Sequence, residues 1–168
     1  VKMGYAVFPN ELGVRLFPLL LNVLSLLIIE KLTDRKNPFL FYGIALSLAI
    51  LQISGFNAVP DIPLIFFTAL FFLCYKKFAA EQSWRNTLLL GLSIALLFYT
   101  KYHAVLIVLF TIVSNTRLLA KHKTYLAGFI ALILFLPHLA WQFEHGWISL
   151  RYHLFESNVN AYKFSFTA

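Results

Sequence analysis

The sequence predicts an all-α membrane protein of about six transmembrane helices, and composition, apolar runs and charge placement support this prediction. Of the 168 residues, 60% are hydrophobic and only 12% are charged. Soluble domains are nearer half apolar and a quarter charged, so lipid is the expected solvent. The 14 Lys and Arg residues form short clusters between the apolar runs. A net charge of +7 in this arrangement indicates membrane topology, not nucleic-acid binding.

A single membrane domain over residues 1–168 is expected, with an outer-face segment at 142–168. The first two apolar runs are long enough to cross about 30 Å of hydrocarbon. The third is short, but Lys76 and Lys77 at its end can extend it by snorkelling. The sixth is interrupted late by Pro137 and closes on Trp141, a residue type favoured at the interface. The six expected spans are residues 12–30, 38–56, 62–75, 87–100, 103–116 and 124–141.

The fourth and fifth runs form one stretch, NTLLLGLSIALLFYTKYHAVLIVLFTIVS, which allows one helix or two. One helix would place Lys101 near the middle of the membrane, whereas two would place it at a turn. With two helices, the loops KLTDRKN, KKFAAEQSWRN and RLLAKHK share one side and hold nine of the 14 Lys and Arg. The positive-inside rule therefore favours six spans with these loops in the cytoplasm. NAVPDIP, TKYH and the C-terminal segment then face outside.

Two charged residues on this outer side are candidates for chemistry. Asp61 stands between prolines at the start of the third span, where it either caps the helix or acts at the membrane surface. Lys101 is recessed between short spans, and such a cation suits an anionic group such as a lipid phosphate. Arg15 either pairs with Glu11 four residues earlier or gives a second phosphate contact.

The histidines and aromatic residues have less specific patterns. His103, His138, His145 and His153 match no compact metal-ligand spacing, and His138 is expected to bond the backbone freed by Pro137. Trp141, Trp147, Tyr152 and Phe155 are typical of an interfacial belt, with a substrate groove as the alternative. No Gly-rich phosphate loop or GxSxG motif is present, which excludes a soluble nucleotide-dependent enzyme.

Four segments in order resemble one family of membrane enzymes. They are ELGVRLFPLLLNVLSLLIIEKL, PDIPLIFFTALFFLCYKKF, LLLGLSIALLFYTKYHAVLIV and the HGWISLRYH tail. The chain resembles the bacterial dolichyl-phosphate-mannose-protein mannosyltransferase-like group, which includes the aminoarabinose transferases and has the GT-C fold. The resemblance runs through nearly the whole chain, and its most specific parts are the PDxPL and YTKYHAV segments.

The resemblance implies sugar transfer from a polyprenyl-phosphate donor on the outer face of the bacterial inner membrane, usually with inversion. It assigns Asp61 to the family's second acidic position, and Lys101 and Arg15 to the donor phosphate. The acceptor is a lipid, a glycan or a protein, and no nucleic acid is expected. The cofactor is unknown, with a divalent metal left open. The residues expected to line the substrate groove are Tyr102, His103, His145, Trp147 and Tyr152.

The chain departs from the family pattern at its beginning. The family's catalytic carboxylate lies in the loop after the first helix, and GYAVFPNELGVR resembles only the end of that loop. Glu11 lies outside the acidic motif, so it is not assigned as the base. The chain is therefore expected to be an internal fragment that is inactive by itself. The alternatives are a transporter or flippase that uses Asp61 and Lys101 as an intramembrane charge pair, and a membrane scaffold.

Overall fold

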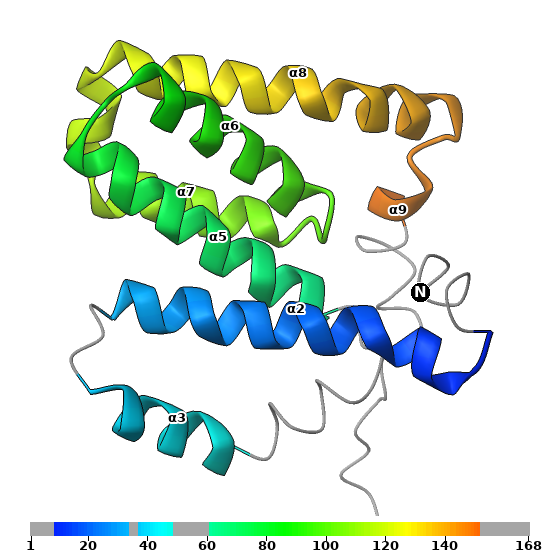
Figure 1. Ribbon diagram of the computed structural model, residues 1–168. Helices are drawn as coiled ribbons and strands as arrows, with labels where there is room; N and C mark the ends of the chain where they lie inside the picture. Colours follow the sequence, from blue (N-terminus) through cyan, green and yellow to red (C-terminus); the bar gives the residue numbers. More distant parts are fainter. Residues whose placement is uncertain (1–8, 34–36, 49–60, 152–168) are drawn as a thin grey trace, which may run out of the picture.

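The structure is a computed structural model that describes residues 9–33, 37–48 and 61–151. All regular structure within these ranges is helical, as Figure 1 shows. The elements are α2 (Glu11–Leu32), α3 (Pro38–Ser47), α5 (Asp61–Ala80), α6 (Trp84–Phe98), α7 (Ala104–Ser114), the 3-10 helix η1 (Thr116–Ala120), α8 (His122–Glu144) and α9 (Ile148–Arg151).

Three helices begin at side chains that cap them. The Asn10 side chain accepts a hydrogen bond from the Gly13 N–H at the start of α2. The Asn37 side chain caps α3 in the same way, and the Ser83 side chain caps α6. Pro38 occupies the first position of α3. Such caps satisfy backbone donors that have no partner within the helix, so these helices start where the local sequence specifies.

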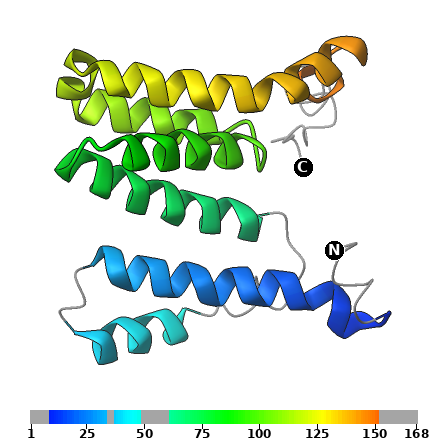
Figure 2. The ribbon, with the colours of Figure 1, turned by 45° about the horizontal axis from the view of Figure 1, so that its top comes forward.

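The helices lie roughly side by side, and neighbouring helices alternate in direction along the α5, α6, α7 and α8 series (Figure 2). The most extensive packing joins α2 to α5, α5 to α6, and α6 to α8. Phe71, Phe78 and Leu97 form the buried core with Ala127 and Ala131 of α8. Small residues at the interface between two membrane helices let their backbones approach closely. Ala127 and Ala131 have this role where α8 packs on α6.

The all-α membrane class is confirmed, but the number of long spans is lower than expected. Within the described residues, three helices are long and apolar enough to cross a membrane: Gly13–Leu32, Asp61–Ala80 and His122–Glu144. The other three, α3, α6 and α7, have 10, 15 and 11 residues. At 1.5 Å per residue, 15 residues cover about 22 Å, which is less than the roughly 30 Å of a hydrocarbon core. The expected span at 38–56 runs beyond α3 into residues outside the described part.

The structure also decides between one helix and two for residues 86–114. A turn at residues 99–103 separates α6 from α7, and the chain reverses direction there (Figure 1). The prediction of two elements is therefore confirmed, although each is short. The sixth expected span differs in another way, because α8 continues through Pro137 as far as Glu144.

Polar groups are sorted between the two ends of the helix array. At one end, Lys76 Nζ lies 3.4 Å from the Leu32 carbonyl oxygen, and Asn115 donates to the Tyr75 hydroxyl at 3.0 Å. We call this the basic end; its described cations are Lys31, Lys76, Lys77, Arg85, Arg117, Lys121 and Lys123. The opposite end, the Asp61–Lys101 end, holds Asp61, Lys101, Tyr102, His138 and Gln142.

Candidate functional site

Asp61 and Lys101, 40 residues apart in sequence, meet at one end of the molecule. Asp61 is the first residue of α5, and Lys101 lies in the turn between α6 and α7. The Lys101 ammonium donates a hydrogen bond to Asp61 Oδ1, and the two form an ion pair. Because Asp61 is in the first turn of α5, its carboxylate also interacts favourably with the positive end of the helix dipole. Both residues are predicted to lie on one side of the membrane, and in the structure they are in contact.

The two side chains of this ion pair remain accessible. The Lys101 side chain is 33% exposed and that of Asp61 is 52% exposed. An ion pair at this exposure contributes only about 0–1 kcal/mol to stability in water. An ammonium has three N–H donors. Lys101 can therefore donate one hydrogen bond to Asp61 and still donate to an oxygen atom of a bound anion. The pair is thus suited to holding a phosphate in a fixed position.

A hydrogen-bond network ties the Lys101 turn to α8. The Tyr102 hydroxyl lies 3.1 Å from His138 Nε2 and accepts a hydrogen bond from Gln142 Nε2. In the same turn, the Tyr99 hydroxyl donates to the Leu134 carbonyl at 2.9 Å. Gln142 is only 2% exposed. Two tyrosines on either side of Lys101 therefore fix the turn against α8.

Aromatic rings surround His138 and continue along α8. The His138 ring centroid lies 5.0 Å from that of Phe135 and 5.6 Å from that of Tyr99. It also stacks on Trp141 at 6.2 Å, and Trp141 stacks on His145 at 4.3 Å. Planar rings of this kind offer faces on which an apolar or ring-shaped ligand can pack.

The end of α8 is closed by a left-handed turn. Gly146 has φ 64° and Trp147 has φ 57°. The Trp147 N–H donates to the Gln142 carbonyl at 2.8 Å, the 6→1 bond of a Schellman motif. His145 Nδ1 lies 2.8 Å from the Trp141 carbonyl oxygen. Positive φ at a tryptophan is unusual, and here it directs the chain after α8 away from the helix axis.

Arg15, His103 and Tyr152 are the remaining expected site residues. Arg15 pairs with Glu11 at 3.6 Å, with side chains 40% and 89% exposed, so the i,i+4 interpretation describes the observed contact. Its role toward a phosphate stays a prediction. His103 is exposed just before α7 and makes no side-chain cap bond to that helix. Tyr152 lies outside the described residues.

A comparison with family sequences decides the class. A sequence model of the dolichyl-phosphate-mannose-protein mannosyltransferase family matches residues 2–141, which is most of the chain. The chain belongs to this family. No curated protein and no solved structure matches the chain. The protein is therefore a membrane glycosyltransferase of the mannosyltransferase type, or part of one.

In this mannosyltransferase-family chain, His138 and Gln142 of α8 both contact the Tyr102 hydroxyl, which the sequence did not predict. His138 does not serve the backbone freed by Pro137 as expected, because α8 stays helical there and the His138 ring reaches Tyr102. Gln142 was not among the predicted site residues. Residues four apart lie on one face of a helix, so the H-x-x-x-Q spacing in an apolar run was the available signal.

The described part of this family member contains no group of three or more His, Cys, Asp or Glu side chains placed to hold a metal ion. Glu144 and His145 are neighbours at the end of α8 and are both exposed.

Proposed function

We propose that this chain forms part of an enzyme that transfers a sugar from a polyprenyl-phosphate donor to an acceptor hydroxyl at the membrane surface. The observation that carries the proposal is the Asp61–Lys101 pair at the end of the array opposite the basic end. Membership of the mannosyltransferase family supports the reaction class. The basic end faces the cytoplasm under the positive-inside rule, so the Asp61–Lys101 end faces the outside of the inner membrane.

Lys101 acts on the leaving group in this proposal. When the bond between the anomeric carbon and the phosphate oxygen breaks, the bonding electrons remain on the polyprenyl phosphate. A fixed ammonium stabilises that developing negative charge more than it stabilises the intact donor, which accelerates the step. Asp61 holds the ammonium in place through their hydrogen bond. Arg15 provides a second phosphate contact once the donor is bound.

The acceptor hydroxyl must lose a proton as it attacks the opposite side of the sugar, with inversion at the anomeric carbon. A carboxylate is the natural base for this step. Asp61 is already paired with Lys101, so it orients the reactants and is not assigned as the base. The family resemblance implies that the base lies in the acidic loop after the first membrane helix of the longer enzyme, so this chain by itself is expected to be inactive.

The sugar is proposed to lie against the aromatic side of the Asp61–Lys101 end. The expected groove residues Tyr102, His103, His145 and Trp147 come from the Lys101 turn and from the end of α8, with Tyr152 outside the described residues. Aromatic faces pack on the apolar faces of sugar rings, while hydroxyl and imidazole groups bond the sugar hydroxyls. The acceptor is a lipid, a glycan or a protein.

Neutralising Lys101 in the intact protein tests this proposal. Transfer is measured from a mannosyl polyprenyl phosphate as the first donor. We expect Lys101→Gln to lower kcat/KM by about 10²-fold or more, the size of effect seen when one charge-stabilising donor is removed. Lys101→Arg is expected to retain more activity because it keeps the charge. Lys31→Gln makes the same change at the basic end and serves as the control.

Unchanged transfer in Lys101→Gln would contradict the assignment. The transporter alternative expects charges near mid-membrane, whereas Asp61 and Lys101 lie at the ends of helices. It also expects substrate movement without sugar transfer, which the same assay distinguishes.

A further inference from the structure

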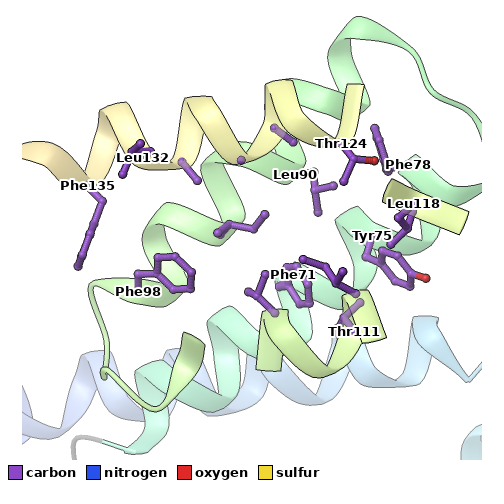
Figure 3. A pocket seen from close by; sticks show the side chains of 16 residues that line it. Phe71, Tyr75, Phe78, Leu90, Phe98, Thr111, Leu118, Thr124, Leu132 and Phe135 are labelled. Carbon is purple, nitrogen blue, oxygen red and sulfur yellow. The ribbon is translucent and has the colours of Figure 1, made fainter. Parts of the chain in front are cut away.

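An apolar cavity of about 380 Å³ lies between α5, α6, α7 and α8. Its walls are mostly aromatic and aliphatic, and Figure 3 shows Phe71, Leu90, Phe98 and Phe135 among them. Engineered apolar cavities of about 150 Å³ already hold a benzene molecule. The residues of α8 that line it run from Thr124 to Phe135, which corresponds to about 16 Å along the helix axis. The cavity therefore has the volume and the length for an alkyl chain.

One end of the cavity lies at the basic end of the molecule. Leu118 and Thr124 line the cavity there, and the Lys121 backbone is hydrogen-bonded to both, at 3.0 Å each. Arg117 precedes Leu118 in η1 and is exposed. Arg117 and Lys121 do not line the cavity themselves, but each lies next to a lining residue, Arg117 in sequence and Lys121 through these backbone bonds. The nearby Lys123 is already engaged by the Gln82 carbonyl and lies over the Trp84 ring.

A buried hydroxyl lies at the same end. Thr124 Oγ1 is buried and has no hydrogen-bond partner among the residues that the structure describes. Burying a hydroxyl without a partner costs free energy, so a ligand that supplies an acceptor at this point gains affinity. Along the chain from the basic end, the cation Lys121, the Thr124 hydroxyl and the apolar lining residues of α8 up to Phe135 follow one another. Phosphate, ester carbonyl and acyl chain follow one another in the same order in a phospholipid.

We propose that this cavity binds one anionic phospholipid from the leaflet at the basic end. Arg117 and Lys121 contact its phosphate, Thr124 donates to an ester carbonyl, and one acyl chain occupies the cavity. Basic groups between membrane helices on the cytoplasmic side are suited to anionic headgroups. This site is separate from the proposed donor site, because Asp61, Lys101 and Tyr102 do not line the cavity.

The first test replaces the two cations. The intact protein is purified in detergent and titrated with dioleoyl phosphatidylglycerol or dioleoyl phosphatidylcholine, and bound lipid is counted by native mass spectrometry. We expect the parent protein to prefer phosphatidylglycerol and the Arg117→Gln/Lys121→Gln variant to bind it at least tenfold more weakly. Lys31→Gln removes a charge at the same end but away from the cavity, and it is expected to bind like the parent.

The second test fills the cavity. Gly128 lines it, and a Cβ atom at this position would meet no atom within 4 Å. Gly128→Leu therefore places a side chain in the cavity without a clash at Cβ, and leucine is also the better helix former. We expect this variant to lose tight phosphatidylglycerol binding. Gly43→Leu is the matched control, because Gly43 is also helical and open but lies on α3.

Thermal unfolding of each variant checks that a loss of lipid is not a loss of fold. Equal binding of the two lipids by the parent would overturn the proposal. So would normal binding in both test variants. If Lys101→Gln lowers lipid binding and Arg117→Gln/Lys121→Gln does not, the cavity holds the tail of a lipid whose phosphate lies at the opposite end, which also overturns the proposal.

Discussion

At the scale of single residues, replacing Lys101 is expected to lower the activity strongly but to change the stability only slightly. Its ion pair with Asp61 joins side chains that are a third and a half exposed. Pairs of this kind contribute about 0–1 kcal/mol. We therefore expect Lys101→Gln and Asp61→Asn each to change the free energy of unfolding by less than about 1 kcal/mol. Reversible unfolding in mixed detergent measures this change, and a loss of several kcal/mol would make the pair mainly structural.

Tyr102 is expected to show a larger effect on stability. Tyr102→Phe removes the hydroxyl that bonds both His138 and Gln142, and Gln142 is buried. Each hydrogen bond contributes about 0.5–1.5 kcal/mol, so we expect a loss of about 1–3 kcal/mol in the same unfolding measurement. Tyr125→Phe is the control, because the Tyr125 hydroxyl donates to the Leu119 carbonyl at an exposed position, where water can replace this bond. Equal losses in both variants would contradict a special role for the network.

At the scale of helices, the contact between α6 and α8 depends on Gly91. A Cβ atom at Gly91 would lie 2.8 Å from the Ala127 carbonyl oxygen and 2.9 Å from Ile130 Cβ. Gly91→Ala is therefore expected to push the two helices apart and to destabilise the protein by about 1–3 kcal/mol. Gly43→Ala meets no atom and should be neutral or stabilising, since alanine is the better helix former. Comparable unfolding curves for the two variants would contradict this close approach.

The helices also show which features the sequence could predict. The turn at Lys101 was predicted, and the structure places the boundary between α6 and α7 there. The caps at Asn37 and Ser83 are also local signals, but neither was predicted. The number of long spans was predicted less well, because apolar runs do not show where a helix ends. Contacts between distant residues were the hardest. Topology predicted only that Asp61 and Lys101 share one side, whereas their ion pair and the contact between His138 and Tyr102 depend on how the helices pack.

At the scale of the whole molecule, the sorting of charges sets how the protein is oriented. The basic end carries seven described cations, with Glu30 and Glu81 as its described acids. The Asp61–Lys101 end has the polar network and the aromatic rings. Since cytoplasmic loops are enriched in Lys and Arg, the two ends are expected on opposite sides of the membrane.

Cysteine labelling tests this orientation directly. Cys74 is the only cysteine, so Cys74→Ser removes the background, and single cysteines are then introduced at His103 or Thr33. Both positions are exposed, His103 at the Asp61–Lys101 end and Thr33 at the end of α2. In intact cells a membrane-impermeant thiol reagent should label His103→Cys, and it should label Thr33→Cys only after permeabilisation. The reverse pattern would place the proposed transfer site on the cytoplasmic side, and labelling of both from outside would show that the two ends share one side.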